Sequence, residues 1–427
     1  MSRCSLTTSA VLLSYAVFVA AVSSHHTATA MHNEHEYFKL IWNAQSSRCA
    51  PTWHAPINLS AFDIETNENQ SFYGRVVVLF YEQALGLYPH QQDGTLYHGG
   101  IPQLANLSAH FARMNEDIRS AIPDPNFDGL AVVDYEKWRP LWEMLWGERS
   151  IYRALSVQLV LQQHPTIHID KAAQLARLQF NAAARLFLLR TLTYAQQLRP
   201  KAKWGYYGYP VCSGQQSLGA NCSPFYQQLN NKLNWLFNAS TALYPSIYLK
   251  ESQRTWPQEQ RHAYVQAVLR ESLRLSRRHQ PIYPYSTVAY NLYETEHDTA
   301  DALHFYSERD LCSTIKQSAD VGASGVLLWS SWKSLSTAQG CRAIGDFVQD
   351  LLGPYSVLVT ELARTCAQTK CNGHGRCRQK AASAGCTTWS ALSEYHCVCD
   401  ERYMPPNCQS PTGDYGTLAN AHLAENT

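Results

Sequence analysis

The sequence has no excess of charge of either sign and no cluster of basic residues. Its 35 lysine and arginine residues nearly balance 34 aspartate and glutamate residues, which leaves a formal net charge of +1. Proteins that attract nucleic acids or anionic membranes by their overall field need a basic patch or tail, so we predict neither partner. If the ligand is a polyanion, residues of a local groove must bind it.

The sequence also lacks a hydrophobic run long enough to predict a membrane span. The apolar stretch 10–22 is shorter than the ~20 residues that a membrane helix needs. Arg3 precedes this stretch and small residues fill 20–24, which is the pattern of a signal peptide, predicted here over 1–24. The polar tail 411–427 shows no lipid-anchor signal, so we expect a secreted or lysosomal protein without a membrane anchor.

Cysteine, in contrast, is plentiful. The chain has 13 cysteines, and loss of Cys4 with the signal peptide leaves 13 − 1 = 12. An even number in an oxidising compartment indicates disulfide bonds. A sequon at Asn221 is doubtful because its middle residue, Cys222, is expected to be bridged. The four sequons that predict surface glycosylation are Asn58, Asn69, Asn106 and Asn238.

The segment 127–142 carries the strongest signal for chemistry. Its apolar run, 130–133, fits a buried parallel strand. Asp134 and Glu136 follow at a spacing that points both carboxyl groups to one side of a strand. Such a pair resists double ionisation, so one pKa should rise and the pair would offer a proton donor beside an anion. The alternative, two solvated acids at a strand end, is disfavoured by the tryptophan-rich segment that follows.

Strand-like and helix-like segments alternate about seven times between residues 38 and 355. This rhythm predicts an α/β fold, a distorted (β/α) TIM-like barrel of about seven strands over 31–358. Active sites of such barrels lie at the carboxyl ends of the strands, where this chain has many tyrosines and tryptophans. The expected strands are 38–43, 76–81, 130–133, 204–210, 243–249, 281–290 and 325–331. The expected helices are 104–121, 148–163, 170–198, 225–237, 258–279, 300–319 and 338–362.

The composition changes after the barrel. Six cysteines there have the spacing of an epidermal-growth-factor-like (EGF-like) module, which we predict over 360–410: Cys366, Cys371, Cys377, Cys397, Cys399 and Cys408. So small a module has little core and depends on its disulfides. A metal site is the competing interpretation of clustered cysteines, and the secretory context disfavours it.

Four motifs occur in order along the chain: 127–142, 204–208 (WGYYG), 244–248 (YPSIY) and 325–329 (GVLLW). Together they resemble the hyaluronidase family, glycoside hydrolase family 56, over nearly the whole mature chain. The resemblance implies a monomeric endo-acting hydrolase without cofactor or metal. Its substrate would be a polyanionic polysaccharide, hyaluronan or chondroitin, cut at β-1,4 N-acetylhexosaminide bonds with retention.

The resemblance also implies roles for individual residues. Glu136 would be the sole acid/base, which protonates the glycosidic oxygen and then deprotonates the attacking water. The acetamido oxygen of the substrate would attack C1, which is the substrate-assisted exception to the two-carboxylate scheme. Asp134, Tyr207 and Tyr248 would hold this acetamido group, with Trp329 against its methyl. Further substrate contacts would come from Asn43, Tyr81, Arg139 and Tyr290.

Five disulfides follow from the same resemblance: Cys49–Cys341, Cys212–Cys222, Cys366–Cys377, Cys371–Cys397 and Cys399–Cys408. Cys312 and Cys386 have no implied partner, so they either bridge the barrel to the tail or stay free.

Two departures leave the substrate open between hyaluronan and chondroitin. Hyaluronan-cleaving relatives often carry an arginine near the position of Val268 and an acid at that of Val211, and both positions are expected in the substrate groove. A catalytically silent binding or adhesion protein of the same fold is a second hypothesis. A chitinase-like hydrolase is a third, which the last three motifs disfavour.

Overall fold

The computed structural model describes residues 37–212, 221–290, 303–331, 333–381, 386 and 390–412. The signal peptide predicted over 1–24 and nearly all of the polar tail lie outside these residues. Among the described helices, none is both long and apolar enough to cross a membrane.

Parallel strands form the barrel wall in two runs, β2-β1-β9-β8 and β3-β6-β7. The strands are β1 (Lys39–Trp42), β2 (Ile64–Thr66), β3 (Val77–Tyr81), β6 (Leu130–Asp134), β7 (Lys203–Tyr206), β8 (Tyr285–Thr287) and β9 (Gly325–Trp329). Single bridges, Tyr207 to Tyr244 and Ser246 to Tyr285, connect the two runs. The expected strand 243–249 is therefore irregular, because Pro245 lacks the N–H that a regular ladder needs.

One side chain joins the two runs at their other edge, between β2 and β3. Asn67 Oδ1 accepts hydrogen bonds from the N–H groups of Val76 and Val77, at 3.0 and 3.2 Å. Its Nδ2 donates to the carbonyl of Val77 at 2.8 Å. A Cβ on Gly74 would lie 2.7 Å from Asn67 Cγ, so this position has room only for glycine. The side-chain amide of Asn67 thus supplies hydrogen bonds of the kind that backbone groups supply between the other strands of the wall.

The alternation of side chains along β6 explains how the barrel presents a carboxyl group. Ala131 and Val133 are in the apolar cluster outside the strands, which includes residues of helix α4 (Ile169–Leu198). Leu130 and Val132 are in the cluster inside the barrel. Side chains alternate along a strand, so Asp134 continues the inward row at the carboxyl end.

Helices surround the strands, and their bounds differ from the expected ones mainly at the ends. The longer ones are α2 (Leu107–Ala121), α3 (Ser150–Gln163), α4 (Ile169–Leu198), α7 (Gln258–Leu275), α10 (Ala338–Phe347) and α11 (Gly353–Lys370). Two helices, α5 (Pro224–Lys232) and α6 (Asn234–Ala239), replace the single helix expected over 225–237. That expected over 300–319 is α8 (Glu308–Leu311), a π-helical turn at Cys312–Lys316 and α9 (Gln317–Asp320).

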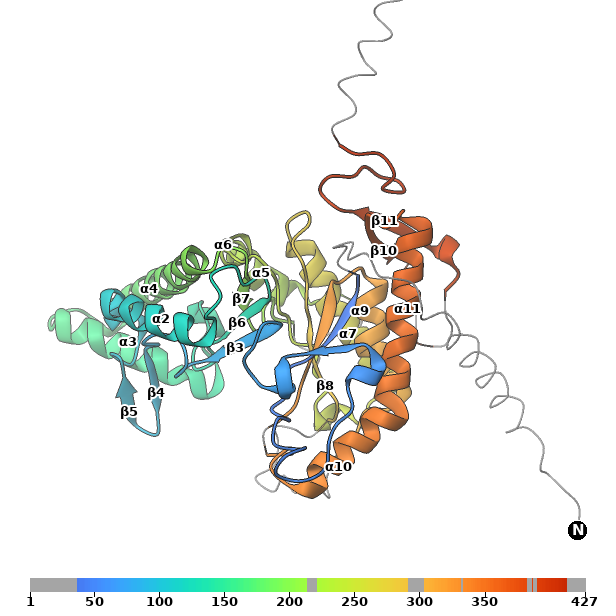
Figure 1. The fold of residues 1–427 in the computed structure, drawn as a ribbon. Helices are drawn as coiled ribbons and strands as arrows, with labels where there is room; N and C mark the ends of the chain where they lie inside the picture. Colours follow the sequence, from blue (N-terminus) through green and yellow to red (C-terminus); the bar gives the residue numbers. More distant parts are fainter. Residues whose placement is uncertain are drawn as a thin grey trace, which may run out of the picture. The chain divides into compact units, whose positions relative to one another are not determined.

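The helix that ends the barrel continues into the cysteine-rich tail. A π-helical turn at Val348–Leu352 joins α10 to α11, and the wider turn lets the helix pass Pro354, which cannot donate a backbone hydrogen bond. Figure 1 shows α11 leading to the hairpin of β10 (Gly375–Gln379) and β11 (Tyr395–Cys399). The boundary predicted at 358–360 falls inside this helix.

Six disulfides are present among the described residues. Five are the pairs expected above. The sixth joins Cys312 to Cys386, with 5.7 Å between the Cα atoms, and so links the barrel to the tail. The bond decides between the two alternatives left open for these cysteines.

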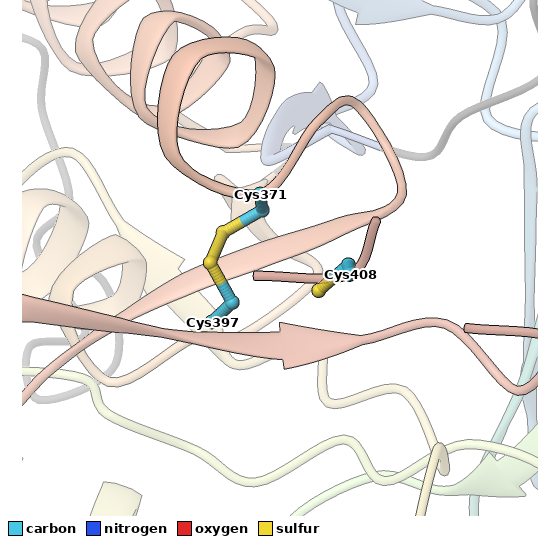
Figure 2. Close-up of side chains that lie close together, drawn as sticks. All are labelled: Cys371, Cys397 and Cys408. Atoms are coloured by element: carbon cyan, nitrogen blue, oxygen red, sulfur yellow. A yellow bond between two sulfur atoms is a disulfide. The ribbon is translucent and has the colours of Figure 1, made fainter. Parts of the chain in front are cut away.

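Cysteine sulfurs in the tail lie close enough together to suggest a metal site. Cys371, Cys397 and Cys408 have sulfurs within 4.8 Å of one another. Figure 2 shows the first two bonded to each other with Cys408 beside them, and Cys408 is bonded to Cys399. A metal needs free thiolates, so this cluster is a disulfide core.

A buried histidine should make the stability of the fold fall in acid. Leu87 N–H donates to His110 Nδ1 at 2.8 Å, and Nε2 lies 3.0 Å from Thr191 Oγ1. Burial lowers the pKa of His110 from 6.5 to about 4. Between these values the unfolded chain binds more protons, so stability falls as the pH drops through this window, by about 3 kcal/mol.

We expect His110→Gln to flatten the pH dependence of the free energy of unfolding between about pH 4 and 6.5. Denaturant unfolding across this range, with exposed His168→Gln as the control, measures it. An unchanged slope in His110→Gln would show that other groups dominate.

Candidate active site

The carboxyl ends of the strands bring the predicted site residues together. Tyr81 is the last residue of β3 and pairs in register with Asp134, the last residue of β6. Tyr207 directly follows β7, and its N–H donates to the carbonyl of Val133 at 3.0 Å. Trp329 ends β9 and its Nε1–H donates to the Tyr81 hydroxyl at 3.1 Å. This last bond spans the barrel mouth from one strand run to the other.

Glu136 presents its carboxyl group to solvent while its backbone is fixed. Its side chain is 43% exposed, and Oε1 accepts a hydrogen bond from Arg139 Nη2 at 3.2 Å. Arg149 donates through Nε and Nη2 to the backbone carbonyl of Glu136, at 3.1 and 3.0 Å. The N–H of Glu136 donates to Glu82 Oε1 at 3.3 Å. The residue is therefore held at both backbone groups and remains accessible at the carboxyl group.

Asp134 is the opposite case. It is buried, and no hydrogen-bond partner reaches its Oδ1 among the described residues. Burial raises its pKa well above the usual range, the carboxylates of Glu136 and Glu82 raise it further, and Arg139 acts against them. The sequence predicted that one of the paired acids would have a raised pKa, and Asp134 is that acid.

Three aromatic side chains stand beside the two acids. The ring of Tyr248 lies 6.0 Å from that of Tyr207 and stacks on Trp329 at 6.3 Å. The Tyr207 hydroxyl donates to Ser246 Oγ at 3.2 Å. Burial, and then the charges of Glu136 and Asp134, raise the pKa of Tyr207, so its hydroxyl stays protonated and can donate a hydrogen bond.

A cavity of about 360 Å³ opens at this end of the barrel. Of the predicted residues, it is lined by Glu136, Arg139, Tyr207, Tyr248 and Tyr290. It also has lining residues that were assigned no role from the sequence, namely Ser246, Lys250, Tyr264 and Thr287. Ser246 is the serine of the YPSIY motif, which was the available signal for it; Lys250 and Thr287 had none.

Four of the predicted site residues do not line this cavity: Asp134, Tyr81, Trp329 and Asn43. Asn43 is only 1% exposed, and its Oδ1 accepts a hydrogen bond from the Tyr285 hydroxyl at 3.0 Å. The groove position proposed for Val268 is wrong, because Val268 is 1% exposed in the apolar cluster beneath α7. Six of the seven residues at 263–269 are apolar, so the sequence does not show which face of this part of the helix is buried.

Val211, the other departure, does line the cavity, and a buried network fixes it there. Its N–H donates to Asn230 Oδ1 at 3.1 Å, and its carbonyl accepts from Asn230 Nδ2 at 2.9 Å. The same Nδ2 donates to Glu271 Oε1 at 2.8 Å, and Arg274 donates to both carboxyl oxygens of Glu271. The backbone at this wall of the cavity is therefore rigidly placed.

Comparison with known proteins decides the family. Residues 27–403 match the family model described as hyaluronidase. The chain belongs to the hyaluronidase family. Hyaluronidase-1 of Homo sapiens is 37% identical over 354 residues, which cover 81% of this chain and 79% of that protein. A chondroitin hydrolase of Caenorhabditis elegans is 34% identical over 379 residues, covering 87% of this chain and 80% of that protein.

Solved structures agree with the assignment to the hyaluronidase family. Bee venom hyaluronidase in complex with a hyaluronic acid tetramer matches with a TM-score of 0.67 and 29% identity. The match covers 75% of this chain and 99% of that one. The TIM-like barrel expected from the sequence is thereby confirmed, and so is the class of enzyme, a glycoside hydrolase.

Proposed function

We propose that this hyaluronidase-family chain cuts β-1,4 N-acetylhexosaminide bonds inside hyaluronan or chondroitin, with retention and with help from the substrate's acetamido group. One observation carries the proposal. Among the described lining residues of the cavity, Glu136 is the single carboxylate. A retaining mechanism with an enzyme nucleophile needs two carboxyl groups about 5 Å apart at the scissile bond. With one in the cavity and the other buried, the nucleophile comes from the substrate.

In the first step, protonated Glu136 gives its proton to the glycosidic oxygen while the acetamido carbonyl oxygen attacks C1. The C1–oxygen bond to the leaving sugar breaks, and a cyclic oxazolinium forms on the sugar that stays bound. In the second step, the Glu136 carboxylate takes a proton from water as that water attacks C1 and opens the ring. Two displacements at C1 retain its configuration, and Glu136 ends protonated again.

In this proposal, the neighbours of Glu136 bind the substrate or hold Glu136 in position. Asp134 and the Tyr207 hydroxyl orient and polarise the acetamido group, so that its oxygen develops charge in a preorganised site. Tyr248 and Trp329 enclose the acetamido methyl with their stacked rings. Arg139 holds the carboxyl group of Glu136 in position, and Lys250 offers a cation to a uronic acid carboxylate along the cavity.

The substrate comes from the class that the relatives' names describe, since they include both hyaluronidases and a chondroitin hydrolase. These polymers differ in the stereochemistry of one hydroxyl on the N-acetylated sugar. We propose that both are cut, and that the backbone around Val211 takes part in the preference between them. The chain acts as a secreted or lysosomal glycoprotein, which the disulfides and the exposed positions of Asn58, Asn69, Asn106 and Asn238 support.

The test is a product analysis on the purified mature chain. We expect hyaluronan and chondroitin to yield even-numbered oligosaccharides whose new reducing end is first released in the β form, as proton NMR shows, and chitin oligosaccharides to remain intact. Release of the α form would contradict retention. Binding of the polymers without cleavage would support the silent adhesion protein instead.

A further inference from the structure

A second cavity, of about 180 Å³, lies where the cysteine-rich tail meets the barrel. Helix α7, the π-helical turn with α9, and strand β10 form its walls. None of its lining residues belongs to the active-site cavity. Cys312 and Cys386 both line it, so their disulfide holds the two sides together. We call this cavity the junction groove.

Positive charge dominates the junction groove. Four of its lining side chains are cations, Arg270, Lys316, Arg378 and Lys380, and one is a carboxylate, Asp320. The formal balance is 4 − 1 = +3, with His262 neutral, in a chain whose net charge is +1. Asp320 is already engaged, because Lys316 Nζ and the Tyr395 hydroxyl both donate to it.

Arg378 and Lys380 are the cations least compensated by the protein. Arg378 Nε donates to the carbonyl of Val321 at 3.1 Å, and within the described chain its two terminal nitrogens have no acceptor. Burial and the neighbouring charge of Arg376 lower the pKa of Arg378, so an anion here would relieve unfavourable electrostatics. Lys380 is exposed and forms no ion pair with a described carboxylate.

The hairpin supports these cations rigidly. Arg378 lies opposite His396 in the β10–β11 register, and the N–H of Lys380 donates to the carbonyl of Glu394 at 2.8 Å. The side chain of Arg376 donates to Ser324 Oγ on the barrel. A preorganised set of cations loses little entropy when an anion binds.

We propose that the junction groove is a second, non-catalytic binding site for a carboxylate- or sulfate-bearing sugar of the glycosaminoglycan. The inference rests on the proposed function for the identity of the polymer. The groove has room for one acidic group with part of its sugar ring. Because hyaluronan and chondroitin carry an acidic group in each disaccharide, a long chain that occupies the active site supplies further acidic groups to the groove.

Occupation of two sites by one polymer raises its effective concentration at the active site. An oligosaccharide too short to reach both sites gains nothing. The groove should therefore act on the KM for long polymers and leave kcat unchanged. Its contacts are partly exposed charges, so salt should weaken the effect.

The experiment compares the double variant Arg378→Ala/Lys380→Ala with wild type on long hyaluronan, on long chondroitin sulfate and on a hexasaccharide. We expect the KM for the polymers to rise about 5-fold, with a shallower dependence on salt, and the KM for the hexasaccharide to stay the same. Arg342→Ala, on the exposed face of α10, is the matched control. Since Arg378 also contacts the Val321 carbonyl, the single variant Lys380→Glu tests the groove without disturbing that contact.

Equal polymer KM values in wild type and both groove variants would overturn the proposal, and so would an equal rise on the hexasaccharide. A binding measurement tests the junction groove independently of the proposed function. Glu136→Gln protein, with and without the groove substitutions, is titrated with the long polymers. Weaker binding by the groove variants supports the groove even if wild type proves inactive, and equal binding overturns it.

Discussion

Glu136→Gln is expected to abolish hydrolysis while leaving the fold and polymer binding intact. Gln keeps the shape and can still accept from Arg139 Nη2, but it has no proton to give to the leaving oxygen. General acid/base catalysis contributes about 10²–10⁴-fold, and here one group serves both steps, so we expect a loss in kcat at the upper end of this range or beyond.

The measurement is kcat and KM on a defined oligosaccharide, with circular dichroism to monitor folding. Glu82→Gln is the control, because Glu82 does not line the cavity: it accepts from the backbone N–H of Glu136 and acts on Asp134 through its charge alone. It should change kcat by less than tenfold. If Glu136→Gln retained a tenth of the wild-type kcat, another residue would have to be the acid/base.

The substitution Asp134→Asn should stabilise the fold and lower the activity. The buried carboxyl group has a raised pKa, so above the ordinary pKa of about 3.9 the folded state binds a proton that the unfolded state has lost. Stability therefore falls as the pH rises through that window, and the neutral amide avoids the cost. We expect a higher Tm at pH 7 than in wild type.

The same substitution, Asp134→Asn, should lower kcat. An amide cannot polarise the acetamido group as the carboxyl group does, and loss of one preorganised contact to a developing charge costs about 10²–10³-fold in kcat. A variant with wild-type kcat, or with a lower Tm, would contradict the role given to Asp134.

Much of this site was readable from the sequence because strand periodicity is strict. Leu130, Val132 and Asp134 are two residues apart, and once β6 is recognised their common direction follows. The aromatic residues at the ends of β7 and β9 are placed by the same logic. The disulfide between Cys312 and Cys386 was undetermined, since spacing in sequence does not show which sulfurs meet in space.

The features that the sequence did not predict depend mainly on contacts between segments that are far apart along the chain. Arg149 is thirteen positions from Glu136 and reaches its carbonyl across a turn. Val268 was misplaced because six of the seven residues at 263–269 are apolar, so the sequence shows no single buried face in this part of α7. The domain boundary at 358–360 was predicted from a change in composition, and backbone helix formation continued through it as far as Lys370.

The two connections between barrel and tail close part of the chain into a ring. From Cys312 the backbone runs through α11 to Cys386 and returns through the disulfide. A protease that cuts once between 342 and 385 therefore opens the ring without releasing a fragment, because that bond still joins the two pieces. Freeing the tail through α11 takes two different chemistries, hydrolysis of a peptide bond and reduction of a disulfide. A nicked molecule would gain only the mass of one water and would keep its junction groove until a reductant reached it.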